Sequence, residues 1–324
     1  MPAKDSSTAI SAPLPTSERA MALVVARKFY LEDHSKVEIA DELQISRFKV
    51  ARLIEQARSL GLITISINDE GLVDEDLSAR VAAKLGIDEA RVIEAYGDDT
   101  HVRDQVGKAA GELLTETLRP GDVLGMAWGR TLSSMTESLP SLPPMTIVQL
   151  TGAAGMNIFQ SPVELVRKLV QASGGSAYPI YAPLVLADPT TAEALRSQPD
   201  IARALSRYSE VTTAVMSIGS WQPPESQLYE SIHPDDRQGL LDRGVVAEIS
   251  GVLLAEDGSE PAPDFLERCI CATAAELRAI PRVLAVAAGA RKAAAVRAVA
   301  RAGLMNGLVT DRTLAEAVLA LPDS

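Results

Sequence analysis

A chain of 324 residues, 47% apolar and 23% charged, has room for one small and one large folded domain of ordinary globular composition. Its net charge of −12 argues against a protein that binds polyanions over its whole surface. No apolar run reaches the length that spans a bilayer, so we expect no membrane association. Residues 1–16 lack the apolar core of a signal peptide, which predicts a disordered tail and a cytoplasmic protein.

Residues 36–58 predict two helices joined by a tight turn. Ser46 is a natural N-cap for the second helix. Gln44 stands where such turns usually have glycine, and a left-handed conformation there would cost about 1 kcal/mol. The apolar residues recur at helical spacing on one face of each helix: Ile39, Ala40 and Leu43, then Val50, Leu53, Ile54 and Ala57.

The residues left on the outer face are mainly basic and lie near the start of the second helix. This arrangement is typical of a recognition helix, whose N-terminal residues contact bases in the major groove. An ordinary helical hairpin with a charged, solvated face is the alternative. The candidate DNA contacts are Lys36, Ser46, Arg47, Phe48, Lys49 and Arg52.

The segment after the second helix favours DNA binding. Gly61 is placed to end that helix, and the alternating residues 62–69 predict a short strand of the kind that forms a wing. We therefore expect a winged helix-turn-helix domain over residues 17–68.

The cysteines do not indicate a metal or redox site, since Cys269 and Cys271 are the only two cysteines and only three histidines occur. We expect two buried thiols on a helix, with no metal site and no cofactor.

The charge is unevenly distributed along the chain. Residues 17–68 carry eight basic and seven acidic side chains, a net charge of +1, whereas residues 69–324 carry −13. Within residues 45–60 the balance is four basic to one acidic. A single module so weakly basic would bind DNA feebly, so we expect a homo-oligomer, a dimer or a tetramer.

From residue 71 onward, segments typical of strands alternate with segments typical of helices. Strands are predicted within 91–97, 119–129, 145–155, 281–289 and 308–311, and helices within 71–86, 101–118, 130–139, 290–303 and 312–321. Such alternation predicts a doubly wound, mostly parallel sheet with helices on both faces over residues 69–324. Ligands in these folds bind at the carboxyl ends of the strands.

The first candidate anion site follows the strand at 119–129. Gly125 and Gly129 precede a predicted helix that opens with Arg130 and Thr131. Free N–H groups, the helix dipole and these two side chains can hold a phosphate. A plain strand–helix turn is the alternative. Trp128 is a core residue or the wall of such a pocket.

Two further strand ends carry candidate ligand groups. Thr151 and Gly152, followed by Asn157, offer backbone and amide groups to hydroxyls, although a simple loop is equally consistent with them. Lys292 lies in the first turn of a helix, where the dipole disfavours a cation, and a bound anion would explain it. Asp311 ends the next strand.

These motifs together resemble the SorC/DeoR-type sugar-binding transcriptional regulators of bacteria, from about residue 20 to the end of the chain. The N-terminal motif residues are Ile39-Ala40, Leu43–Arg47 and Val50–Leu53. The matches in the large domain are Trp128–Thr131, Ile218-Gly219, Gly289–Lys292 and Leu308–Asp311.

The resemblance implies an effector domain similar to sugar-phosphate isomerases and deaminases, in which a phosphorylated sugar alters the affinity for operator DNA, and tetramers built from dimers. It places Gly129, Arg130 and Thr131 in a phosphate loop, and Lys292 in the effector site. The sequence departs from the family pattern at three points: Gln44 replaces Gly, Ala288 replaces Gly, and Ala247-Glu248 replace Gly-Asp. We expect Gly219 and Glu248 in the effector site as well.

Three functions are consistent with these observations. The first is a ligand-controlled DNA-binding regulator, a repressor of a carbohydrate-utilisation operon, with double-stranded operator DNA and a phosphorylated sugar as partners. The second is a sugar-phosphate isomerase or deaminase, with Glu248 or Asp311 as base and His101 or His233 as weaker choices. The third is a helix-turn-helix used only for protein contacts. The first is favoured, since no His/carboxylate constellation stands out and we expect no catalytic residues.

Overall fold

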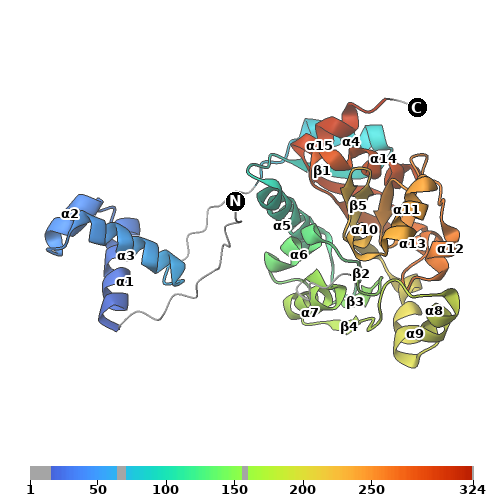
Figure 1. Ribbon diagram of the computed structural model, residues 1–324, viewed down its shortest axis with the longest axis horizontal. Coiled ribbons are helices and arrows are strands. Elements are labelled where there is room, and N and C mark those ends of the chain that lie inside the picture. Colours follow the sequence, from blue (N-terminus) through green and yellow to red (C-terminus); the bar gives the residue numbers. More distant parts are fainter. Residues whose placement is uncertain (1–15, 64–70, 155–159, 323–324) are drawn as a thin grey trace, which may run out of the picture. The chain divides into compact units, whose positions relative to one another are not determined.

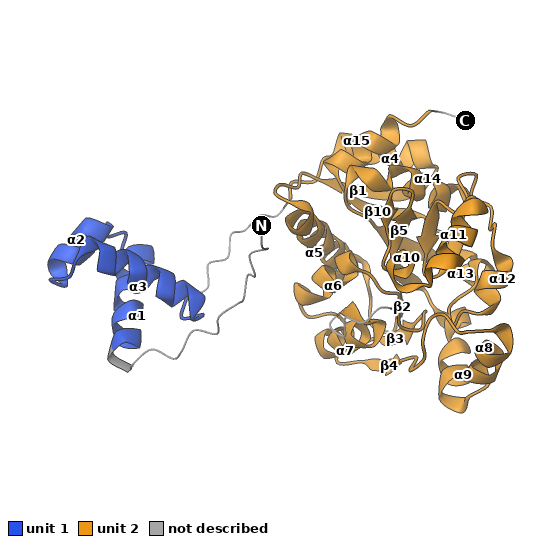
Figure 2. Ribbon diagram, in the orientation of Figure 1, with its two compact units in different colours: residues 1–68 blue, residues 69–324 orange. Residues whose placement is uncertain are grey.

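The computed structural model describes residues 16–63, 71–154 and 160–322. The chain forms two compact units, residues 1–68 and residues 69–324 (Figure 2). The predicted tail lies outside the described residues except for Thr16, which begins the first helix. The predicted wing strand at 62–69 also lies outside them, apart from Leu62 and Ile63.

Three helices pack around one apolar cluster in the first unit. They are α1 (Thr16–Tyr30), α2 (Lys36–Glu42) and α3 (Arg47–Ser59). Helix α1 contributes Ala22, Val25 and Ala26 to the cluster. Of the residues that the sequence places on the inner faces of the two helices, Leu43 is half-buried against the cluster and the others are buried in it: Ile39, Ala40, Val50, Leu53, Ile54 and Ala57.

The turn between α2 and α3 has the geometry that the sequence predicts. Gln44 adopts the left-handed conformation, with φ of 52°, and its amide Nε2 donates to the carbonyl of Asp41 at 2.7 Å. This hydrogen bond offsets part of the conformational cost. Ser46 caps α3, since its Oγ accepts a hydrogen bond from the backbone N–H of Lys49 at 3.2 Å.

A parallel sheet forms the centre of the second unit (Figure 1), in the strand order β1–β10–β9–β5–β2–β3–β4. Every neighbouring pair in this order is parallel. The strands are β1 (Glu89–Ile93), β2 (Val123–Met126), β3 (Thr146–Gln149), β4 (Ser176–Tyr178), β5 (Thr213–Trp221), β9 (Arg282–Val286) and β10 (Gly307–Asp311). The chain winds outward from β2 to β4, returns to β5 and winds outward on the other side, so the winding direction reverses between β2 and β5.

Helices cover both faces of this sheet. One face carries α5 (Asp99–Thr117), α6 (Arg130–Glu137) and α7 (Pro162–Ser173), and the other carries α4 (Glu75–Leu85), α14 (Ala293–Arg301) and α15 (Arg312–Leu319). In β5, Ala214 and Met216 belong to one apolar cluster and Val215 to the other, because successive strand side chains point to opposite faces. The predicted doubly wound, mostly parallel fold is confirmed.

The far half of β5 leaves the parallel sheet and joins an antiparallel extension. Parallel partners contact β5 as far as Ser217, and residues from Ile218 onward pair with β6 (Pro224–Glu225) and β7 (Ala247–Ile249). The remaining elements lie outside the parallel sheet and the six helices that cover it. They are β8 (Val252–Leu254), α8 (Pro189–Arg196), α9 (Pro199–Leu205), η2 (Tyr208–Glu210), α10 (Gln227–Ser231), α11 (Pro234–Asp242), α12 (Pro263–Glu267), α13 (Ala274–Ala279) and η3 (Ala290–Lys292).

The prediction that both thiols lie on a helix is wrong. Helix α12 ends at Glu267, and Cys269 and Cys271 lie in extended chain that bridges to Val185 and Thr151. Side chains two residues apart lie on the same side of an extended strand but on opposite sides of a helix. The spacing of Cys269 and Cys271 therefore fits extended chain. Cys269 is buried and Cys271 half-buried.

Candidate functional site

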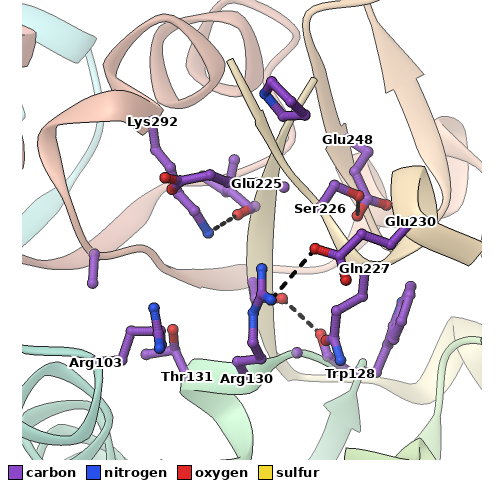
Figure 3. A pocket seen from close by; sticks show the side chains of 16 residues that line it. Arg103, Trp128, Arg130, Thr131, Glu225, Ser226, Gln227, Glu230, Glu248 and Lys292 are labelled. Carbon is purple, nitrogen blue, oxygen red and sulfur yellow. Dashed lines mark hydrogen bonds and ion pairs between the residues drawn. The ribbon is translucent and has the colours of Figure 1, made fainter. Parts of the chain in front are cut away.

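A polar cavity of about 250 Å³ opens at the carboxyl ends of β2, β5 and β9, beside the point where the winding reverses (Figure 3). Parallel sheets leave backbone N–H groups and loop side chains free at such a point. Residues of all three strand exits line it, together with residues of α5, β6, α10 and β7. The side chains labelled in Figure 3 are Arg103, Trp128, Arg130, Thr131, Glu225, Ser226, Gln227, Glu230, Glu248 and Lys292.

The exit of β2 forms the first wall of the cavity. Gly129 has a φ of 148°, and a Cβ there would lie 2.1 Å from Oγ of Ser217, so the position requires glycine. The Ser217 hydroxyl donates to the carbonyl of Trp128 at 2.6 Å and holds this turn against β5. Helix α6 begins at Arg130 without a side-chain cap among the described residues. Its first-turn N–H groups and the Thr131 hydroxyl are therefore available to an anion.

The turn that follows β9 carries Lys292 into the cavity, and Asp311 stabilises this turn. The Asp311 carboxylate accepts the Gly289 N–H at 2.7 Å and also caps α15 through the N–H groups of Thr313 and Leu314. Lys292 reaches back across the cavity, where its Nζ donates to the carbonyl of Ile218 at 2.7 Å. Burial lowers the pKa of Lys292 to about 8, and the positive charge of Arg130 acts in the same direction.

The antiparallel extension supplies a buried carboxyl group opposite these cations. Glu248 is 6% exposed, and its Oε1 accepts the Ser226 hydroxyl at 2.7 Å. Its Oε2 is enclosed without a hydrogen-bond partner in the described part of the chain. Burial raises the pKa of Glu248, opposed by the Ser226 hydroxyl and the charge of Lys292. Gly219 lies against this group, because a Cβ there would approach Oε1 of Glu248 to 2.5 Å.

Charges of both signs meet in the cavity. Figure 3 shows Arg103 and Lys292 on one side and Glu248 and Glu230 on the other, with Arg130 between them. Arg130 Nη1 lies 3.5 Å from Oε1 of Glu230. Outside the cavity, Arg291 forms an ion pair with Glu225, one of the lining residues, at 3.0 Å. The site is therefore suited to a ligand with an anionic group at one end and hydrogen-bonding groups at the other.

The structure brings together six of the eleven residues predicted from sequence for effector binding. Gly129, Arg130, Thr131, Gly219, Glu248 and Lys292 line the cavity. Trp128 is both a buried core residue and a wall of this cavity.

The other predicted effector residues lie elsewhere. Gly125 is inside β2, where a Cβ would meet Leu150 and Val211 at 2.9 Å. Asp311 does not line the cavity and instead accepts the Gly289 N–H in the turn before Lys292. Thr151 is buried in a bridge to Cys271, and Gly152 allows close packing, since a Cβ would lie 2.5 Å from the Pro183 carbonyl oxygen. Asn157 lies outside the described residues.

Ser217, inside β5, and five further polar lining residues were not predicted from sequence. Of the five, Arg103 lies in a helix with no local motif, and the others lie within residues 225–230, which follow the Ile218-Gly219 motif and carry no motif of their own. The five are Arg103, Glu225, Ser226, Gln227 and Glu230.

The predicted DNA contacts cluster at the exposed start of α3. Ser46, Arg47, Phe48 and Lys49 are exposed in succession, and Phe48 is 89% exposed although it is aromatic. Arg52 follows one turn later, where its Nη2 lies 3.4 Å from Oε1 of Glu18 in α1.

Lys36 lies at the start of α2 and is half-buried, with its Nζ 5.6 Å from the centre of the Phe29 ring.

In the part of the chain that the structure covers, no cluster of His, Cys, Asp or Glu could hold a metal ion. No helix in that part is long and apolar enough to cross a membrane.

A family model described as "Putative sugar-binding domain" matches residues 72–320 of this chain. The chain belongs to this family. The resemblance to SorC/DeoR-type regulators is thereby confirmed, and curated relatives of this sugar-binding family carry the names of transcriptional regulators.

Three relatives match this family member over nearly its whole length. The transcriptional regulator LsrR of Klebsiella pneumoniae is 28% identical over 95% of each chain. A protein of Escherichia coli K12 named as an uncharacterized transcriptional regulator, YjhU, is 26% identical over 90% of this chain and 92% of its own. The crystal structure of the full-length sorbitol operon regulator SorC from Klebsiella pneumoniae shares the fold, with a TM-score of 0.71 at 22% identity, over 94% of this chain and all of that one.

Proposed function

We propose that this protein is a DNA-binding transcriptional regulator, a repressor of a carbohydrate-utilisation operon, whose affinity for operator DNA is controlled by a phosphorylated sugar. One observation carries the proposal: a cavity with Arg103, Arg130 and Lys292 around the start of α6 belongs to the same chain as an exposed basic helix of a three-helix unit. Names of relatives such as LsrR and the sorbitol operon regulator support it.

The ligand's phosphate would lie between the start of α6 and the two side chains Arg130 and Lys292. Helix N–H groups and a guanidinium bind phosphate oxygens through charge-assisted hydrogen bonds. The sugar hydroxyls would then face Glu248, whose carboxyl oxygens accept hydrogen bonds, and Ser226 and Gln227, whose side chains both donate and accept them.

The DNA-binding part of the proposal requires more than one copy of the chain. A unit with a net charge of +1 neutralises few phosphates, so a dimer or tetramer that places several α3 helices on one operator would supply the missing affinity. Such a protein would act in the cytoplasm, where bacterial DNA lies.

Catalysis is not part of the proposal, because the candidate bases are poorly placed for it. Among Glu248, Asp311, His101 and His233, only Glu248 lines the cavity. The Asp311 carboxylate is occupied by backbone N–H groups. Both histidine side chains are about two-thirds exposed or more, at 69% and 70%.

Thermal unfolding with a panel of free and phosphorylated sugars tests the effector part of the proposal. A ligand at about 100 times its Kd stabilises the folded state by about 2.7 kcal/mol, which corresponds to a rise in Tm of about 5 °C for a unit of this size. We expect the rise with a sugar phosphate and none with the same sugar lacking the phosphate. A rise with the free sugar alone, or turnover of any sugar phosphate by the pure protein, would contradict the proposal.

Effector affinity is expected to fall as the pH rises above about 8. The unliganded Lys292 has a pKa of about 8, and a phosphate dianion favours its charged form, so binding at higher pH must take up a proton. Affinity then drops by up to about tenfold per pH unit until the pKa of the bound state is reached. Isothermal titration between pH 7 and pH 9.5 measures the slope. An affinity that stays constant to pH 9.5 would exclude Lys292 as the phosphate ligand.

A further inference from the structure

The ion pair between Arg130 and Glu230 crosses the mouth of the cavity. Arg130 begins α6 and Glu230 lies in the short helix α10, far apart in sequence, and Nη1 and Oε1 are 3.5 Å apart. The side chains are 35% and 60% exposed, respectively. Exposed pairs at this distance contribute little to stability, so a stronger partner can separate them.

We propose that Glu230 is a built-in competitor for the effector: its carboxylate neutralises Arg130 in the free protein and is displaced when an anionic group of the ligand binds. This rests on the proposed function, since it assumes that the effector is anionic and uses Arg130. A phosphate oxygen beside the N–H groups of α6 forms stronger, charge-assisted hydrogen bonds with a guanidinium than the distant Glu230 does.

Displacement of Glu230 would remove one contact from α10, whose Leu228 remains buried in the core. The Ser226 hydroxyl caps it and also donates to Glu248, and Gln227 donates to Gln160 at 2.9 Å. The ring of Tyr229 meets Trp221 edge to face at 5.3 Å. Helix α10 therefore links the anion end of the cavity, through Glu230, to the buried carboxyl end, through Ser226. An anion in the cavity would therefore loosen the exposed side of α10 at Glu230.

Titration of inorganic phosphate into the full chain, in phosphate-free buffer at constant ionic strength, measures the competition. Glu230→Gln removes the competing charge, and we expect it to bind phosphate about two- to fivefold more tightly than the parent. Arg130→Gln should bind about tenfold more weakly, because a charge-assisted hydrogen bond is lost. In the Arg130→Gln background, Glu230→Gln should give no further gain, since its effect acts through Arg130.

Glu193→Gln is the matched control for the loss of one negative charge. Glu193 lies in α8 outside the cavity, is 72% exposed and pairs with Arg196 at 3.3 Å. We expect its phosphate affinity to equal that of the parent. A similar gain in Glu193→Gln, or a gain from Glu230→Gln that persists without Arg130, would show a general charge effect and overturn the competition.

The two proposals fail in distinguishable ways. If Glu230→Gln binds phosphate as the parent does while Arg130→Gln binds weakly, the competition is absent and the effector site stands. If Arg130→Gln binds phosphate as the parent does, the proposed effector site is wrong and the competition with it. Hydrogen exchange gives a second readout: the amides of residues 227–231 should exchange faster in Glu230→Gln than in the parent, and unchanged rates would overturn the proposed response of α10.

Discussion

Replacing Arg47 and Lys49 together by alanine is expected to lower the affinity for operator DNA by about 100-fold or more. Both side chains are exposed in the first turn of α3, the part of a recognition helix that enters the major groove. Neither contributes to the apolar cluster beneath them, so the folded protein should be unaffected. Fluorescence anisotropy measures the loss, with a duplex that the parent protein selects from a random pool.

Arg58→Ala is the matched control on the same helix. Arg58 is exposed in the last turn of α3, away from the end that would meet the bases. It should lose little specific affinity and change only the salt-dependent part of binding. Specific binding that survives the Arg47/Lys49 double substitution would contradict the assignment of α3 as the recognition helix and favour protein contacts instead.

Replacing Lys292 by methionine is expected to weaken binding of a sugar phosphate by about 10- to 100-fold, because a charge-assisted hydrogen bond in a half-buried site is lost. Methionine keeps the unbranched apolar stem, one atom shorter, and removes the charge. The Lys292 ammonium carries a desolvation cost in the free protein, as its lowered pKa shows, so the substitution should not destabilise the fold. Isothermal titration gives the affinity, and thermal unfolding without ligand gives the stability.

Lys168→Met provides the same chemical change away from the cavity. Lys168 lies in α7 and pairs with Glu137 at 3.5 Å. We expect parental ligand affinity for this variant. Equal affinities of Lys292→Met and Lys168→Met would remove Lys292 from the effector site. A loss in both would attribute the effect to the overall charge of the unit.

The local part of the fold could be predicted from the sequence because short-range rules determine it. Helical spacing identified the buried faces of α2 and α3, and the hydroxyl of Ser46 identified the start of α3. In the large unit, Gly129 and Lys292 were predictable since a glycine-rich strand exit and a cation at a helix start are local signals. Both line the cavity.

Sequence alone could not show which strand ends open into the cavity, because long-range pairing decides this. Gly152 and Gly129 both follow strands. Gly152 packs against Pro183, whereas Gly129 packs against Ser217 in the wall of the cavity. Glu230 depends on the antiparallel pairing that turns the chain back after β5. Arg103 depends on the packing of α5 against α6 beside the sheet. None of these contacts leaves a pattern in neighbouring residues.

Ligand control of DNA binding is tested most directly by one titration. The sugar phosphate that gives the largest rise in Tm is added to the complex of the full chain with its selected duplex, and anisotropy follows the release of DNA. The affinity for the duplex should fall by about 5- to 150-fold, a coupling of about 1–3 kcal/mol, and should not change in Lys292→Met. An unchanged affinity of the parent protein at saturating ligand would contradict the proposal that the effector cavity controls DNA binding.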